Sequence, residues 1–171
     1  ISSYSAERTR EAAAILRDSN INDVKIEPVP GTLTDHYDPR HKVLRLSESV
    51  YGSTSMSAAG VAAHEVGHAI QHAQGYAPLK FRSAWVPVAN LGGGLSIFIL
   101  IAAAMMGGAG SVMGSKMAVA GVLLFSTTTL FTLVTLPVEF DASKRALATL
   151  RRGSYLTPDE QQGAKKVLDA A

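Results

Sequence analysis

The sequence contains no cysteine among its 171 residues. This absence excludes disulfide bonds, thiolate zinc sites and a cysteine nucleophile, and it fits a reducing compartment. The formal net charge is only +2, and no basic stripe with interleaved aromatic residues is present. Nucleic acid is therefore not expected as a partner.

Two long stretches lack any charged residue. Residues 84–106 and 117–138 each reach the roughly 20 apolar residues that a helix needs to cross a bilayer. The linker 107–116 is short and glycine-rich, which favours a tight turn. A soluble core would need more surrounding protein to bury both helices. We therefore predict a transmembrane helical hairpin over 84–138, with close helix contacts at small residues: Gly92, Gly93, Gly94, Thr127, Thr128, Thr129 and Thr132.

Two histidines stand four residues apart just before these stretches, with a glutamate directly after the first. On a helix His64 and His68 lie on one face, one turn apart, and Glu65 sits beside them. This is the HExxH pattern, in which both imidazoles bind zinc and the carboxylate takes a proton from an attacking water. The alternative is a buried helix whose histidines bond to neighbouring groups.

The surrounding residues favour a helix for this motif. Ser55 or Ser57 can cap its start, the run 58–74 contains no proline, and Gly75 suits its end. The motif is therefore expected within one helix.

The third zinc ligand has few candidates. Gln71 and Gln74 stand where metzincins have a glycine and a third histidine, which excludes that subclass. His72 lies too far along the same helix to share the ion, and we interpret it as a solvated or supporting residue. The next aspartate, glutamate or histidine is Glu139, followed closely by Asp141. We predict Glu139 as the third ligand of one zinc ion per chain, with a fourth position left for water.

Charges around the hairpin predict its orientation. The second stretch is followed by four basic residues, Lys144, Arg145, Arg151 and Arg152. The first stretch is preceded by Lys80 and Arg82, whereas the turn contains Lys116 alone. By the positive-inside rule the metal-binding part faces the cytoplasm. Neither stretch contains an ionisable group, which disfavours metal transport as a function.

The residues before the motif predict a helix and a small antiparallel sheet. Ser5 caps a helix that runs to Ser19. Segments 24–28, 33–37 and 42–46 resemble strands, the last two joined by a proline turn. The strand 42–46 has either a structural role or holds an extended peptide substrate.

A polar cluster lies near this turn. It comprises Asp35, His36, Asp38 and His41. Turns attract aspartate for bonding to the backbone, so a second metal site is the less favoured interpretation. If one of these residues reaches the zinc ion, His36 is the candidate.

The segment after the second stretch predicts two further helices. Pro137 can begin a helix over 138–151, with Glu139 in its first turn and Ser143 one turn further. Asp141 and Arg145 could support the zinc ligands there. Thr157 to Glu160 forms a cap for a last helix toward the end of the chain.

Three stretches carry a resemblance to a known family: Pro30–Pro39, Ala62–Gln71 and Leu136–Ser143. They resemble the bacterial "putative neutral zinc metallopeptidase" family, the YugP-like membrane proteins. The resemblance implies a multi-pass protein of the bacterial inner membrane that acts on peptide or protein substrates, membrane proteins included. Family members usually carry further hydrophobic segments at both ends, which implies that this chain is part of a longer protein.

A more distant similarity is to membrane peptidases of the Ste24 and HtpX type. There a glutamate after a membrane hairpin completes the zinc site within an ExxxD pattern. Glu139 matches the glutamate, but Ser143 stands at the aspartate position. Asp141 or Asp35 could supply the missing carboxylate support.

The expected fold is mainly α with a small antiparallel sheet. A zincin-like HExxH domain, made by residues 1–83 and 139–171, is interrupted by the hairpin 84–138 (helices 84–106 and 117–138). The expected function is zinc-dependent endopeptidase activity at the membrane, with Glu65 as the general base. The alternative is a membrane scaffold or interaction protein with a structural zinc site.

Overall fold

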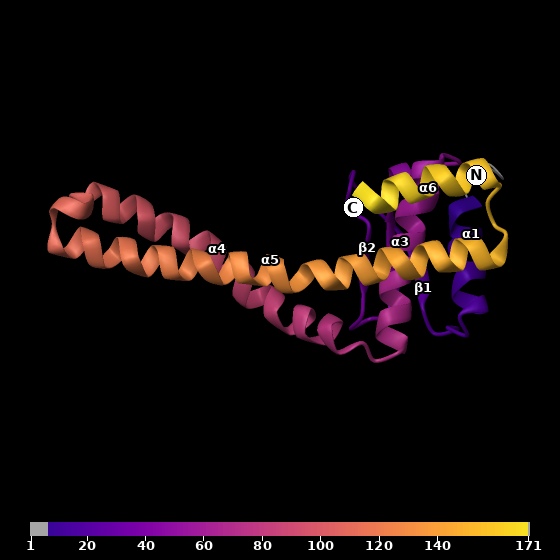
Figure 1. Ribbon diagram of the computed structural model, residues 1–171, viewed down its shortest axis with the longest axis horizontal. Coiled ribbons are helices and arrows are strands. Elements are labelled where there is room, and N and C mark those ends of the chain that lie inside the picture. Colours follow the sequence, from indigo (N-terminus) through magenta and orange to yellow (C-terminus); the bar gives the residue numbers. More distant parts are fainter. Residues whose placement is uncertain (1–6, 171) are drawn as a thin grey trace. The chain divides into compact units, whose positions relative to one another are not determined.

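The computed structural model describes residues 7–170, which are mainly helical (Figure 1). In chain order the elements are α1 (Glu7–Asp18), β1 (Lys25–Val29), β2 (His36–Asp38), β3 (Val43–Ser47), α2 (Glu48–Tyr51), α3 (Met56–Ala73), α4 (Ala77–Met105), the short 3-10 helix η2 (Gly108–Gly110), α5 (Val112–Gly153) and α6 (Pro158–Ala170). The chain divides into two compact units. One runs to Tyr76 and resumes at Glu139, and the other is Ala77–Val138.

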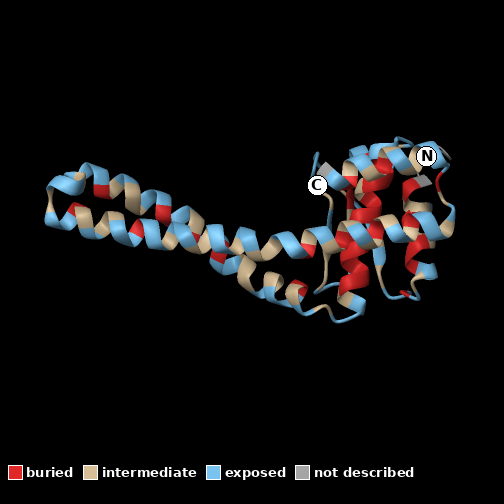
Figure 2. Ribbon diagram, in the orientation of Figure 1, coloured by how far each residue is buried: buried red, intermediate tan, exposed pale blue. Residues whose placement is uncertain are grey.

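Helix α3 is the central element of the first unit, and it is buried along most of its length (Figure 2). Its N-cap is Ser55, whose side-chain oxygen accepts a hydrogen bond from the backbone N–H of Ala58 at 3.2 Å. Gly75, at φ +68°, follows its end in the left-handed region that glycine favours. The helix predicted around the motif is therefore confirmed, with Ser55 as its cap.

Other helices cover α3. Helix α1 packs against it, and α6 crosses it where Gly60 leaves space for Val167. The start of α6 is a capping box, because the Thr157 backbone N–H donates to Glu160 Oε2 at 2.8 Å. The predicted cap at Ser5 lies outside the described residues. The shared core consists mainly of small and branched side chains, among them Ile15, Leu44, Leu46, Val66 and Leu150.

The sheet has three strands in the order β1-β3-β2, and it is mixed. Strand β2 pairs antiparallel with β3, as the proline turn predicts. Strand β1 pairs parallel with β3, so the prediction of an antiparallel sheet is wrong for this pair. Alternation along a strand indicates which face is buried but not the direction of its partner. Because β3 is bonded on both sides, its edges are not open to an extended peptide.

Helix α5 is one continuous helix of 42 residues with Pro137 in its interior. The prediction that Pro137 begins a new helix is therefore wrong. A proline removes one backbone hydrogen bond, but a long helix with intact bonds on both sides tolerates that loss. Glu139 is consequently an interior residue of α5 and is not in a first turn.

The second unit is a hairpin of α4 and the first part of α5, which lie side by side near the turn and diverge toward the start of α4 (Figure 1). A Cβ added at Gly92 or Gly93 would meet Thr127 Oγ1 or Thr128 Oγ1 at 3.4 Å. These contacts between the two helices confirm the prediction for those residues, whereas Gly94 has nothing within 4 Å of its Cβ position. Gly107 at φ +92° opens the turn.

Both hairpin helices are long and apolar enough to cross a membrane. Their most apolar windows have mean hydropathies of 2.0 and 1.9. Only 22% and 6% of these windows are buried within the described chain. The alternative of two core helices in a soluble protein is thus disfavoured, because the chain leaves their apolar surface uncovered.

Candidate metal centre

Three potential ligands converge between α3 and α5. The Nε2 atoms of His64 and His68 lie 3.0 and 3.2 Å from the same carboxylate oxygen, Oε2 of Glu139. The three potential ligand atoms, one from each residue, all lie within 4.8 Å of one another. The sequence separates Glu139 from the histidines by about 70 residues, and the structure brings it to both rings.

In each histidine the other ring nitrogen, Nδ1, lies within hydrogen-bonding distance of a further side chain. His64 Nδ1 lies 3.0 Å from the hydroxyl of Ser143 on α5. His68 Nδ1 lies 3.0 Å from Oε1 of Gln71, one turn further along α3. Both side chains leave the Nε2 atoms directed at Glu139, the arrangement that metal-binding histidines commonly show.

Gln71 connects the site to a polar chain on α5. Its Nε2 donates to Asp141 Oδ2 at 2.8 Å, and Arg145 Nε donates to the same carboxylate at 2.5 Å. Arg145 also donates to the side-chain oxygen of Gln74. Sequence reasoning named Asp141 and Arg145 but missed the supporting position of Gln71. The available signal was its spacing, three residues after His68 on the same helix.

Helices α3 and α5 approach each other very closely at Gly67. A Cβ there would lie 2.4 Å from the backbone oxygen of Ala142, far below any normal contact. Only glycine therefore permits this approach at the middle of the HExxH motif. Ala142 lies between Glu139 and Ser143 on α5, so the same contact sets the distance of both residues from the histidines.

Glu65 faces a pocket of about 260 Å³ beside the three ligands. Its lining combines polar residues, Asp35, His64, Glu65 and Glu139, with the apolar residues Leu33, Gly60, Val61, Val167 and Leu168. Burial raises the pKa of Glu65, and the neighbouring histidines only partly oppose this effect. A carboxylate with a raised pKa is better matched to proton transfer near neutral pH.

The electrostatics of His68 depend on Glu139. Burial lowers the pKa of His68, but the hydrogen bond that His68 donates to Glu139 and the charge of Glu65 outweigh burial and raise it. The metal-free protein therefore holds a proton on His68 more readily than a free imidazole does.

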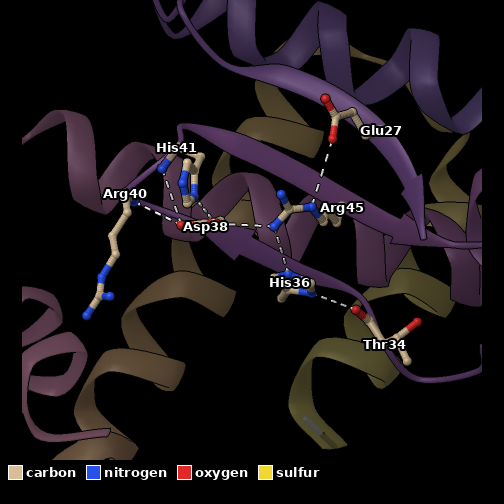
Figure 3. A network of polar contacts seen from close by, with 7 residues as sticks. All are labelled: Glu27, Thr34, His36, Asp38, Arg40, His41 and Arg45. Atoms are coloured by element: carbon tan, nitrogen blue, oxygen red, sulfur yellow. Dashed lines mark hydrogen bonds and ion pairs between the residues drawn. The ribbon is translucent and has the colours of Figure 1, made fainter. Parts of the chain in front are cut away.

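Three polar residues near the β-turn are not brought to the candidate ligands: His36, Asp38 and His41. His36 is exposed, and its Nδ1 donates to the backbone oxygen of Thr34 at 2.7 Å (Figure 3). Asp38 accepts from His41 Nδ1 at 2.7 Å and from Arg45 Nη1 at 3.2 Å. The group of three ligands found among residues 7–170 includes neither His36 nor Asp38.

Asp35 and His72 also have local partners. Asp35 accepts from the backbone N–H of Ser47 at 2.7 Å and from its hydroxyl at 2.9 Å, although it lines the pocket. His72 Nδ1 lies 2.8 Å from the hydroxyl of Tyr37. Neither residue hydrogen-bonds to a candidate ligand in these contacts.

The donor set fits zinc in its chemistry. Two ligand atoms bound at about 2.1 Å with tetrahedral angles lie about 3.4 Å apart, close to the separations of 3.0 and 3.2 Å between Glu139 Oε2 and the imidazole nitrogens. Two imidazoles and one carboxylate leave a fourth position for water or substrate, as in catalytic zinc sites. Ser143 and Gln71, which contact Nδ1 of the two histidines, provide the hydrogen bonds that orient histidine ligands in such sites.

The comparison with known families agrees with this donor set. Residues 2–171 match the family described as "Putative neutral zinc metallopeptidase", and the chain belongs to that family. Among its relatives is the "Putative membrane protease YugP" of Bacillus subtilis (strain 168), which is 43% identical over 160 residues. The match covers 94% of this chain and 68% of that relative. No solved structure matches the chain. The similarity to the Ste24 and HtpX type stays a prediction.

Proposed function

We propose that this protein is a membrane-embedded zinc-dependent endopeptidase. The observation that carries the proposal is the convergence of His64, His68 and Glu139 beside a pocket that Glu65 also lines. The family description and the name of the relative support the same activity class. His64, His68 and Glu139 would hold one zinc ion.

A zinc ion bound there would supply a Lewis acid for the peptide carbonyl and would make water more acidic. Glu65 takes the proton of the attacking water on its carboxylate. It then delivers that proton to the nitrogen of the leaving amine as the peptide bond breaks. Its raised pKa makes Glu65 a stronger base for the first transfer than an ordinary glutamate is.

The pocket provides a place for the substrate beside these groups. Its polar lining includes Glu65 and two of the ligands, and its apolar lining comes from α3, α6 and Leu33. Leu33 is almost fully exposed, and its φ of +58° lies in the left-handed region that favours glycine. Such backbone strain at an exposed apolar residue fits a contact surface for a peptide.

The membrane setting rests on the hairpin. Its two apolar helices and the name of the relative indicate a membrane protein. We expect α4 and α5 to cross the bilayer once each, which returns the chain to the side it left. With basic residues concentrated at the open end, that side is the cytoplasm.

The decisive experiment is to compare the detergent-purified protein with its Glu65→Gln variant. We expect Glu65→Gln to keep about one zinc ion per chain but to lose peptide hydrolysis by about two to four orders of magnitude, because no base remains. Casein or a quenched peptide reports hydrolysis, and atomic absorption reports zinc. Glu48→Gln, a change at an exposed glutamate of α2, is the control. Full activity of Glu65→Gln would exclude this mechanism.

The alternative is a scaffold in which zinc only fastens structural elements together. A structural site has four protein ligands. The group among the described residues has three, and a glutamate that is not among them lines the same pocket. Both features favour the enzyme over the scaffold.

A further inference from the structure

We propose that Gln71 and Asp141 are positioning residues, which orient the ring of His68 for zinc through one continuous chain of hydrogen bonds. This inference rests on the proposed zinc site. It differs from direct carboxylate support of a histidine, because here a buried amide lies between the carboxylate and the ring.

The amide of Gln71 determines the direction of every bond in this chain. Its NH₂ group can only donate, and it faces the Asp141 carboxylate at 2.8 Å. Its oxygen can only accept, and it faces Nδ1 of His68 at 3.0 Å. Nδ1 must therefore carry the hydrogen of the neutral ring, which leaves Nε2 bare for a metal ion. A bare Nε2 is the form that binds a metal ion.

Asp141 in turn accepts a hydrogen bond from Arg145. Arg145 Nε donates to its carboxylate at 2.5 Å, and the Arg145 guanidinium lies 5.5 Å from the centre of the Tyr76 ring. A carboxylate that accepts from a guanidinium and from the Gln71 amide cannot donate in return, so the amide cannot turn over without losing its partner.

Gln71 has no room for another arrangement. It is fully buried, with 0% of its surface exposed, and it ranks among the largest buried side chains. A reversed amide would direct its NH₂ group at Nδ1 and its oxygen at a carboxylate. Reversal would therefore replace two favourable contacts with two unfavourable ones.

The support of His64 lacks this directionality. The hydroxyl of Ser143 can donate or accept, so its contact with Nδ1 at 3.0 Å is compatible with either form of the ring. The two histidines are therefore held differently, and the fixed one is His68.

The alternative is a purely structural role, in which Gln71 and Asp141 link α3 to α5 without affecting zinc binding. A double-mutant cycle on zinc affinity separates the two cases. If Asp141 acts through Gln71, removing either residue breaks the same chain. Asp141→Asn should then have no further effect once Gln71 has been replaced.

The experiment uses the full chain in detergent with four forms: wild type, Gln71→Leu, Asp141→Asn and the double variant. Zinc affinity is measured by competition with a chromophoric chelator, independently of peptide cleavage. We expect each single variant to bind zinc about 10- to 100-fold more weakly. The zinc affinity of the double variant should be no lower than that of the single variant with the lower affinity. Asp169→Asn, which changes an exposed carboxylate paired with Lys165, should bind zinc as the wild type does.

A second background keeps the test valid if leucine is not tolerated. Gln71→Glu preserves the shape and places a carboxylate directly on Nδ1 of His68. In that background Asp141→Asn should no longer weaken zinc binding. Losses that multiply in the double variant, or single variants that bind zinc normally, would overturn the inference. A wild-type protein that binds no zinc would instead refute the proposed function itself.

Discussion

Glu139 contacts both histidines in the metal-free protein, and we propose that it also binds zinc. Without the ion, its carboxylate oxygen lies 3.0 and 3.2 Å from two imidazole nitrogens and raises the pKa of His68 against the effect of burial. With the ion, the same oxygen would be the third ligand. A single substitution should therefore change both zinc affinity and the titration of His68.

Glu139→Gln is predicted to abolish tight zinc binding and to lower the pKa of His68. A neutral amide is a poor zinc ligand and no longer stabilises an imidazolium. Zinc affinity by chelator competition and NMR titration of the metal-free protein measure the two effects. The matched control is Glu48→Gln. An unchanged zinc affinity would remove Glu139 from the ligand set.

The raised pKa of His68 also contributes to the pH dependence of the metal-free fold. A histidine whose pKa is higher in the folded state stabilises the fold below its unfolded value of about 6.5. That contribution is lost as the pH rises through the folded value. It should be smaller in Glu139→Gln, which denaturant titrations at several pH values would show.

At the scale of elements, the site depends on how closely α3 and α5 approach. The backbone oxygen of Ala142 occupies the space that a Cβ at Gly67 would need. A backbone atom within a helix cannot turn away as a side chain can, so the whole helix would have to move. The residues that move with it include Glu139 and Ser143.

Gly67→Ala is therefore predicted to destabilise the protein by about 1–3 kcal/mol through overpacking and to weaken zinc binding. Thermal unfolding and zinc affinity measure these effects. Gly94→Ala is the control, because a Cβ there meets nothing within 4 Å. In a helix, the control should be neutral or slightly stabilising. Equal behaviour of both variants would argue against a tight contact at Gly67.

Helix α6 contributes an apolar wall to the pocket through Val167 and Leu168. Val167→Phe should narrow the pocket, so kcat/KM should fall most for peptides with large apolar side chains, while zinc content stays unchanged. The matched control is Lys166→Phe at an exposed position of the same helix. Peptide sets that vary only the residues beside the cleaved bond provide the measurement. If cleavage preference did not change, the substrate would lie elsewhere.

At the scale of the whole molecule, zinc should stabilise the unit that contains its ligands. All three ligands belong to the unit that runs to Tyr76 and resumes at Glu139, and they come from two distant parts of its sequence. An ion that binds only the folded arrangement holds these parts together. Its effect on unfolding then follows from mass action.

Zinc at 100 times its dissociation constant is predicted to stabilise the fold by about 2.7 kcal/mol. Thermal melting in detergent, with zinc and with chelator, would show a rise in Tm that depends on zinc concentration. The control is Glu139→Gln, whose Tm should not respond. An equal rise in that variant would indicate that zinc binds at another site.

The sequence by itself determined the features that depend on local pattern. Spacing on a helix placed His64 and His68 together, because side chains four residues apart lie on one face, and it placed Glu65 beside them. Long uncharged runs indicated the two hairpin helices, and the scarcity of ligand residues after His72 led to Glu139. Each inference used only neighbours in the chain or the composition of a segment.

Only the tertiary structure decided how distant segments meet. Three features could not be predicted: the parallel pairing of β1 with β3, the continuation of α5 through Pro137, and the hydrogen bond from Gln71 to Asp141. A strand pattern does not specify its partner, and a proline can weaken a helix without ending it. A hydrogen bond between residues 70 positions apart follows from packing, and here the packing depends on the missing side chain of Gly67.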